Sequence, residues 1–183
     1  MRKTAFLLLM ALMLMPIAMF GDSYSILWKQ VDEAVQKDLP KTQIQLLQTI
    51  ADKAEAGNDY GQLLKAETRM ASVWYSISAD SLPSQLSRLE DKAEKYSKTD
   101  GALSAVYYAA LGKIYSSYHN VGMFSAVGID NSAKSVECYR KAMANPSLLA
   151  SKKALCYKPF VVEGRDGKYF EDDLLSLIGY TAE

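Results

Sequence analysis

The chain has 183 residues, which is enough for one domain with a sizeable hydrophobic core. Lysine and arginine together number 21, and aspartate and glutamate also number 21, so the formal net charge is zero. This balance argues against a nucleic-acid-binding protein, because such a protein needs a basic excess to neutralise phosphates.

The N-terminus has the pattern of a secretory signal peptide. Arg2 and Lys3 form a positively charged start, and residues 5–14 are an apolar run that Pro16 soon interrupts. The run is shorter than the roughly 20 apolar residues that span a membrane, so it favours a signal peptide over an anchor. We expect residues 1–21 to be the signal and the protein to be exported to the periplasm or cell envelope. Any membrane association would come only from an uncleaved signal.

Beyond this segment, apolar residues recur at the spacing of amphipathic helices. A first helix follows Ser23 as its N-cap and ends before Pro40, because the residue before a proline avoids the helical region. Pro40 opens a second helix, which ends at Gly57-Asn58 in the usual C-terminal manner. Residues 63–77 carry the apolar pattern of a third helix.

Three further helices are predicted before the C-terminal segment. One begins after Pro83, and Asp100 caps the next. Residues 119–129 contain two glycines and no clear period, so they are predicted to form a loop. Asp130 caps the last of the three helices, which ends at Asn145-Pro146. The apolar residues on its predicted buried face are Ala133, Val136, Tyr139 and Met143.

The predicted helices show internal repetition. Leu39-Pro40 recurs as Leu82-Pro83, and the Asp-Lys-Ala-Glu sequence of residues 52–55 recurs at residues 91–94. The offsets are about 40 residues, which is in the range of helical-hairpin repeats. No stretch before Pro159 alternates with the period of a strand, so the sequence predicts an all-α fold.

Two segments sharpen this prediction. Residues 110–115 and 135–142 resemble the first and second helices of a tetratricopeptide repeat, with a longer connection between them. We therefore expect residues 22–157 to form antiparallel helical hairpins in a degenerate tetratricopeptide-like solenoid. The insert around residues 121–124 is either a packed covering loop or a binding loop.

Residues 158–183 differ from the helical region. Two short β-prone runs flank Asp166-Gly167 and favour either a hairpin or an extended strap along the helices. Acidic residues 171–173 favour the start of a terminal helix. Because this helix continues almost to Glu183 without a stop signal, we expect the chain to be part of a longer protein.

The sequence carries no recognisable catalytic, cofactor or metal-binding motif. His119 is the single histidine, so it has no histidine partner for a metal site or an acid–base pair. Cys138 has no activating histidine on its helix turn. For Cys138 and Cys156, buried or free thiols are favoured over a disulfide, although an exported protein could form one.

Several carboxylates lie beside lysines at helical spacing, which indicates surface ion pairs along each helix rather than glycosidase chemistry. We therefore expect a protein that is not an enzyme and uses no cofactor or metal. The carboxylates in question are Asp52, Glu55, Asp91 and Glu94.

Aromatic residues offer the candidate binding surface. The chain has 12 tyrosines, several of which cluster on or just after the predicted fifth helix. They are interpreted either as core and inter-helix packing or as the lining of a concave surface for a protein partner. The candidate partner-binding residues are Tyr107, Tyr108, Tyr115, Tyr118, Met123 and Phe124.

The opening of the predicted mature chain resembles a known family. Residues 24–31, Tyr-Ser-Ile-Leu-Trp-Lys-Gln-Val, and residues 38–42, Asp-Leu-Pro-Lys-Thr, resemble the start of large exported alpha-2-macroglobulin-like proteins of Bacteroidetes. Ala144-Asn145-Pro146 and Tyr157-Lys158-Pro159 resemble the end of the same helical region, so the resemblance covers roughly residues 22–183.

The resemblance implies an N-terminal helical module that precedes β-sandwich domains in an envelope protease inhibitor. The Cys-x-Glu-Gln thioester motif of that family is absent, so no trapping residue carries over. The implied role is non-catalytic docking or positioning with a protein partner. The alternative is a stand-alone periplasmic helical-repeat protein that binds a peptide or a glycan.

Overall fold

The structure is a computed structural model that describes residues 22–117, 131–162, 164 and 171–182. Throughout these residues the regular elements are all helical, which confirms the all-α fold class. The long helices are α2 (Asp22–Gln36), α3 (Pro40–Gly57), α4 (Tyr60–Ile77), α5 (Leu82–Ser97), α6 (Gly101–Ser117) and α8 (Asn131–Ala142). The shorter elements are η2 (Ala79–Ser81), α9 (Pro146–Ala150), η3 (Ala154–Tyr157) and α10 (Leu174–Ala182).

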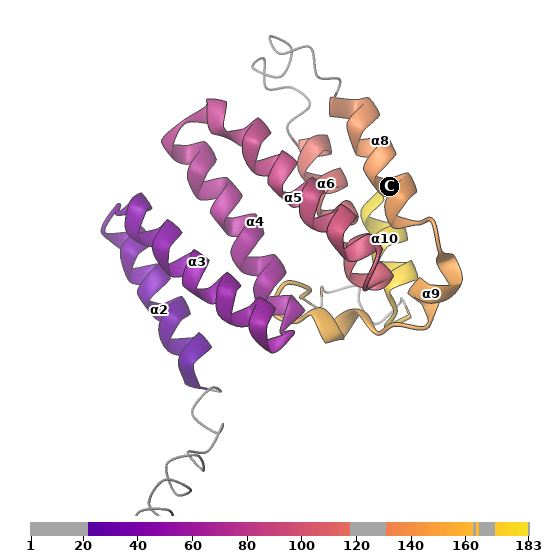
Figure 1. Cartoon of the computed structure of the whole chain (residues 1–183), viewed down its shortest axis with the longest axis horizontal. Coiled ribbons are helices and arrows are strands. Elements are labelled where there is room, and N and C mark those ends of the chain that lie inside the picture. The colour runs from indigo at the N-terminus through magenta and orange to yellow at the C-terminus, as the bar shows by residue number, and fades with distance from the viewer. Residues whose placement is uncertain (1–21, 118–130, 163, 165–170, 183) are drawn as a thin grey trace, which may run out of the picture.

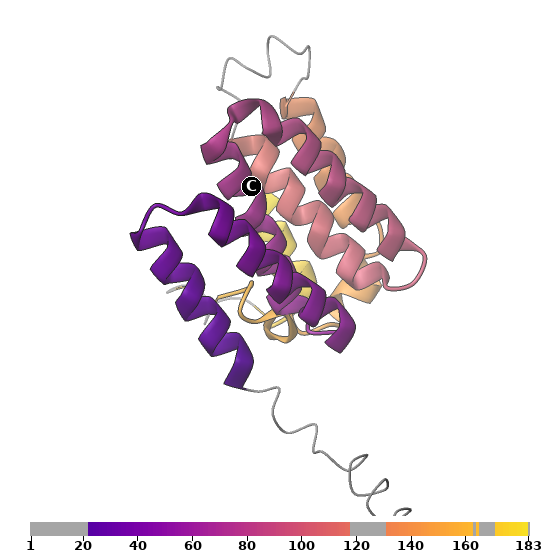
Figure 2. The same cartoon turned by 60° about the vertical axis from the view of Figure 1, so that its left-hand side comes forward.

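Successive long helices lie side by side in an array, with α2 at one outer edge and α8 and α9 at the other (Figure 1). The most extensive packing joins α3 to α4, α5 to α6 and α6 to α8. By contrast, α4 and α5 meet at η2 and diverge towards their other ends. Figure 2 shows the α2–α3 pair set apart from α5 and α6. Side chains of α5 and α6, among them Tyr96 and Tyr107, lie in the wedge between α4 and α5.

Local sequence signals set most helix ends. Pro40 occupies the first turn of α3. Asn58, which follows the last residue of α3, adopts a left-handed conformation with φ of 54°. Asp59 accepts a hydrogen bond from the Gln62 amide at 3.3 Å and caps α4. Asp100 caps α6 as predicted, because it accepts from the Leu103 amide at 3.0 Å. Ser23 was predicted as an N-cap, but it lies inside α2, which begins at Asp22.

Helix α8 buries only part of the predicted face: Tyr139 and Met143 pack against the core as predicted, but Ala133 and Val136 are exposed. Val136 is 66% exposed, whereas Ser135 and Cys138 are buried. The physical reason is close approach to α6: the Ser135 hydroxyl donates to the Gly112 carbonyl at 2.8 Å, and a Cβ atom on Gly112 would lie 2.9 Å from the Tyr139 ring. The side of α8 that faces α6 therefore combines the small Ser135 side chain with the Tyr139 ring, which packs over Gly112.

The segment after α8 contains elements that the sequence did not predict. Asn145 caps the short helix α9 by accepting from the Leu148 amide at 3.1 Å. Residues 153–162, named the strap below, continue through η3 and turns, and residues 160–162 form no strand. The hairpin predicted around Asp166-Gly167 lies outside the described residues. The terminal helix predicted after residues 171–173 is present as α10.

The strap crosses the first turn of α4 at Gly61. A Cβ atom at Gly61 would lie 1.9 Å from the Lys158 carbonyl oxygen, so only glycine permits this approach. Tyr157 is 6% exposed and belongs to the main hydrophobic core, and Phe160 packs against that core. The strap therefore packs against the N-terminal end of α4 and holds it close to the C-terminal part of the chain.

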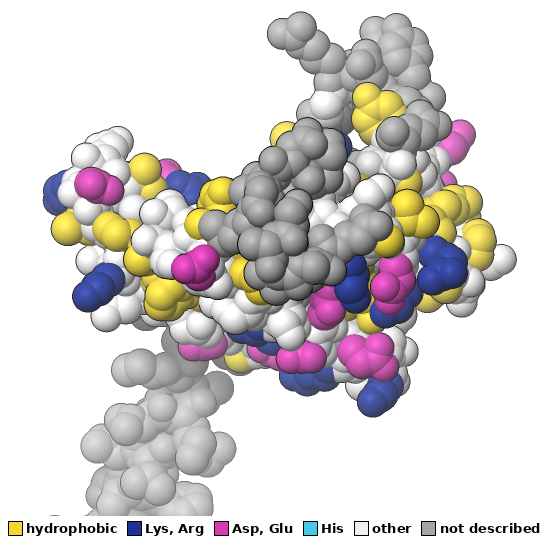
Figure 3. Space-filling view, turned by 90° about the horizontal axis from the view of Figure 1, so that it is seen from above, with side chains coloured by type: hydrophobic (Ala, Val, Ile, Leu, Met, Phe, Trp, Pro, Cys, Tyr) yellow, Lys and Arg dark blue, Asp and Glu magenta, His cyan; other side chains and the backbone are white. Residues whose placement is uncertain are grey.

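The described surface mixes charged and hydrophobic side chains. Seen from above, the right-hand flank, where α8 and α9 lie, shows hydrophobic side chains beside lysine or arginine (Figure 3). Among the described residues, no helix is both long and apolar enough to cross a membrane.

Candidate functional site

A buried carboxylate lies in the wedge where α4, α5 and α6 meet. Glu67 is 2% exposed and accepts a hydrogen bond from the Tyr107 hydroxyl at 2.5 Å. Arg88 Nη1 lies 3.2 Å and Lys92 Nζ 3.3 Å from one carboxylate oxygen of Glu67. These contacts compensate for the loss of water around the charge, which is necessary when a carboxylate is buried.

A second carboxylate extends this network to α3. Glu55 lies 2.6 Å from Lys92 Nζ and 3.0 Å from Lys95 Nζ, and it accepts from the Tyr96 hydroxyl at 3.0 Å. The hydrogen bond from Lys92, with the further contacts, lowers the pKa of Glu55 to about 2. The prediction that Glu55 pairs along its own helix is therefore wrong, because its partners lie on α5. Lys92 joins the carboxylates of Glu55 and Glu67.

Tyrosine rings fill the rest of the wedge. Tyr96 stacks on Tyr107 with ring centroids 5.7 Å apart and meets Tyr60 edge-on at 6.1 Å. Burial, with the neighbouring carboxylates, raises the pKa of Tyr96 and of Tyr107, so both phenols stay protonated and donate. The network as a whole pairs opposite charges between helices. The network therefore acts as a structural contact that holds α4, α5 and α6 together.

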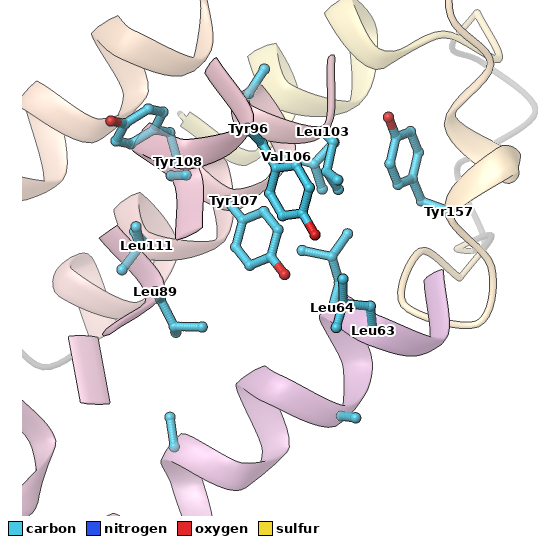
Figure 4. Packing of buried hydrophobic residues seen from close by; sticks show 14 of the residues in the cluster. Leu63, Leu64, Leu89, Tyr96, Leu103, Val106, Tyr107, Tyr108, Leu111 and Tyr157 are labelled. Atoms are coloured by element: carbon cyan, nitrogen blue, oxygen red, sulfur yellow. The ribbon is translucent and has the colours of Figure 1, made fainter. Parts of the chain in front are cut away.

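The structure places three of the predicted partner-binding residues inside the protein. Tyr107 is 1% exposed, and Tyr108 and Tyr115 are also buried. In Figure 4, Tyr107 points towards α4 while Tyr108 projects to the opposite side, towards α8. The Tyr115 hydroxyl donates to Glu90 at 2.8 Å. The packing interpretation is thus confirmed for these three side chains, and their use by a partner stays a prediction.

The remaining predicted residues, Tyr118, Met123 and Phe124, lie outside the described residues. The cysteines are free thiols, with Cys138 buried and Cys156 exposed. Burial, more than the nearby carboxylates, raises the pKa of Cys138 to about 11, so it is unreactive at neutral pH. Within the described part of the chain, no three histidine, cysteine or acidic side chains gather as metal ligands would.

One predicted residue, Tyr108, lines a cavity of about 400 Å³ between α5–α6 and α8–α9, named the interhelical cavity. Its size lies within the range of ordinary ligand sites. Buried small and aliphatic side chains form its floor, namely Ser104, Ala105, Ala142 and Leu149. More exposed residues complete its lining, among them Glu94, Ser97, Gly101, Lys141, Ala144, Asn145 and Leu148.

The rim of the interhelical cavity carries one charge of each sign. Glu94 accepts from the Tyr108 hydroxyl at 3.2 Å, and Lys141 Nζ lies 5.1 Å from the centre of the Tyr108 ring. Lys141 also pairs with Glu137 at 3.0 Å, and this hydrogen bond is the main cause of its raised pKa. Lys141 is 48% exposed, so its positive charge remains accessible from solvent.

A second cavity of about 490 Å³, named the end cavity, lies where three connections meet. The α3–α4 turn contributes residues 57–59, the start of α6 contributes Asp100 and Ala102, and the region around the strap contributes Lys152, Lys153, Cys156 and Tyr157. Tyr60 completes the lining. The sequence alone did not predict that these residues form a site, because they meet only when the three connections converge.

Comparison of the chain with protein-family models, with curated proteins and with solved structures finds no match.

Proposed function

We propose that the chain is a non-catalytic helical-repeat module that binds another protein through the interhelical cavity. The observation that carries this proposal is the cavity itself, with an apolar floor and accessible charges of both signs at its rim. Binding hot spots typically consist of such hollows, into which a partner inserts an apolar anchor. Tyr108, one of the residues predicted from the sequence, supplies part of the lining.

Contacts between alternate helices support a tetratricopeptide-like solenoid as the scaffold. The Trp28 indole on α2 donates to Gln62 on α4 at 2.6 Å. Glu67 on α4 accepts from α6, and Glu55 on α3 pairs with α5. Such links between elements two apart are expected when helical hairpins stack in register, and stacked hairpins create extended binding surfaces.

The cavity defines the chemistry of the partner. Its volume accommodates one or two apolar side chains, and Ala105, Ala142 and Leu149 offer no group that would need a polar counterpart. Lys141 favours an acidic residue beside the anchor, and Glu94 favours a basic residue or an N–H donor. We therefore expect a leucine, isoleucine or phenylalanine flanked by charges in the partner.

Filling the cavity tests this proposal. Ala144→Trp places a large side chain in an exposed part of the lining, and Lys141→Glu reverses the charge at the rim. Ser132→Trp is the matched control, because Ser132 is exposed on α8 and does not line the cavity. Proteins captured from envelope extracts by each variant would be quantified by mass spectrometry, and their affinities measured by calorimetry.

A partner of the cavity would bind the wild type and Ser132→Trp alike. It would lose about tenfold or more in affinity for Ala144→Trp and for Lys141→Glu, which corresponds to about 1.4 kcal/mol. The proposal is overturned if every captured protein binds these variants equally well.

We further propose that this module belongs to a macroglobulin-like envelope protease inhibitor. Support for this comes from the sequence resemblance, which is carried by residues 24–31 and 38–42 and by residues 144–146 and 157–159. An antibody against the purified helical module, used on blots of native envelope, tests the assignment. A band far larger than 20.3 kDa would support it, and a single band near that mass would overturn it.

The second candidate function, binding of a peptide or glycan by a stand-alone periplasmic protein, is favoured by the end cavity. That cavity is larger than the interhelical one and is lined by polar, charged and phenolic groups. These are the groups that orient small polar ligands.

A further inference from the structure

The end cavity brings acidic and basic side chains together without pairing them. Asp59 and Asp100 line it, as do Lys152 and Lys153. Within the described residues, neither lysine has a carboxylate oxygen within 4.0 Å. Glu55 and Lys92, by contrast, pair between α3 and α5 at 2.6 Å.

The two sides of the end cavity are fixed by different constraints. Asp59 accepts from the Gln62 amide and Asp100 from the Leu103 amide, and these capping bonds hold both carboxylates at helix starts. Each carboxylate has further lone pairs for a ligand. On the other side, the Lys152 carbonyl accepts from the Leu174 amide at 2.9 Å, which ties the lysine backbone to the start of α10.

We infer that the end cavity binds a zwitterionic ligand, namely a free amino acid or a dipeptide. Its ammonium group would pair with Asp59 and Asp100, and its carboxylate with Lys152 and Lys153. A volume of about 490 Å³ accommodates a ligand of this size. This inference rests on the second of the two functions proposed above and is independent of the interhelical cavity.

The balance of charge in the cavity selects this class over others. A phosphate would meet the two carboxylates, and a polyamine would meet the two lysines, so each would suffer like-charge repulsion. A neutral saccharide would partly desolvate all four charged groups without compensating any of them. Tyr60 and Tyr157 line the same cavity and provide phenolic rings against which a dipeptide side chain can pack.

Cys156 provides a native reporter of occupancy. Its thiol is exposed and lines the cavity, whereas Cys138 is 3% exposed and should react far more slowly. The rate of thiol modification by a chromogenic disulfide reagent would be measured with alanyl-phenylalanine, and binding would be confirmed by calorimetry. The comparison probes are N-acetyl-alanyl-phenylalanine amide, which lacks both charges, maltose, and inorganic phosphate.

The dipeptide should slow Cys156 modification about tenfold at saturation, while the blocked dipeptide, maltose and phosphate should leave the rate unchanged. Protection by the blocked peptide or by maltose overturns the zwitterion inference but leaves small-ligand binding intact. Protection by none of the probes overturns both the inference and the second candidate function.

Charge-removing variants test the assigned contacts without removing the helix caps. Asp59→Asn and Asp100→Asn keep a capping side chain, because asparagine caps helices as well as aspartate does. Each of them, and the double variant Lys152→Met with Lys153→Met, should weaken dipeptide affinity about tenfold. Lys98→Met is the control, since Lys98 is exposed at the end of α5 and does not line the cavity. Unchanged affinity in all of the cavity variants overturns the inference.

Discussion

Helix α6 contacts α4 and α8 by different means. Towards α4, Tyr107 donates to the buried carboxylate of Glu67, which Arg88 and Lys92 also contact. Towards α8, Gly112 lets the Tyr139 ring approach closely, and no ion pair between described residues joins the two helices. One interface depends on matched polar groups, and the other on matched shapes.

The difference predicts how each interface responds to change. A buried ionic network is sensitive to the loss of any partner, because the groups left behind remain desolvated. A close-packed interface is sensitive to added volume instead. Substitutions that remove a polar group should therefore destabilise the α4–α6 interface. Substitutions that add volume should destabilise the α6–α8 interface.

The largest expected effect is at Glu67. Glu67→Ala should lower the free energy of unfolding by about 3 kcal/mol, because it removes the carboxylate that the Tyr107 hydroxyl and Arg88 contact. Urea unfolding followed by circular dichroism measures this loss of stability, and Glu33→Ala, at an exposed position of α2, is the control. A loss no greater than that of the control would show that the network does not hold α4 to α6.

Removing single hydroxyl groups compares a bond to a charged acceptor with a bond to a neutral one. Tyr107→Phe deletes a bond to a buried carboxylate and should destabilise by about 2 kcal/mol. Tyr139→Phe deletes a 2.7 Å bond to the Thr181 carbonyl and should destabilise by about 1 kcal/mol. Equal losses in urea unfolding would contradict the distinction between a charged and a neutral acceptor.

Adding one carbon atom tests the close-packed interface. Gly112→Ala should destabilise by about 1 kcal/mol, since overpacking against the Tyr139 ring exceeds the gain in helix propensity. The control Gly57→Ala meets no neighbouring atom within 4 Å and should not destabilise in this way. In a Tyr139→Leu background, the penalty at Gly112 should shrink. If Gly112→Ala destabilised the Tyr139→Leu variant just as much, the cause would lie within α6 and not in its packing against α8.

Acid should weaken the ionic contacts between α3 and α5 through Glu55. The folded-state pKa of Glu55 is lowered to about 2, so its stabilising contribution is present above its ordinary pKa of 4.5 and is lost as the pH falls towards 2. Because Glu55 is partly exposed, the effect should be only about 1 kcal/mol. Thermal unfolding between pH 6 and 2 should show a smaller decline for Glu55→Gln than for the wild type; parallel curves would contradict this.

Features set by local sequence could be predicted, and features set by distant residues could not. Pro40, Asn58 and Asp100 mark helix ends through backbone geometry and capping, so their roles are visible in a short window. The partners of Glu55 depend on how α3 and α5 align, and no local pattern encodes that alignment. Ala133 and Val136 were mistaken for buried residues of α8, because the part of this helix that meets α6 depends on the position of Gly112, which lies on another helix.

The candidate sites show the same limit. Tyr108 was singled out as an aromatic residue, but its neighbours Glu94 and Lys141 come from different helices, and only the folded chain brings them to one cavity. Lys152 and Lys153 follow α9 in a segment without periodicity, so nothing near them indicated that they face Asp59 and Asp100.

The contact of the strap with Gly61 has a consequence for the order of folding. Adjacent helices meet over short connections, and contacts between residues close in sequence form early. The contact between Gly61 and Lys158 spans more than half of the chain, so loop-closure entropy delays it. A nascent chain that has not yet emerged beyond Lys158 can pair its helices but cannot close the end cavity. Ligand binding there would therefore mark the completion of folding.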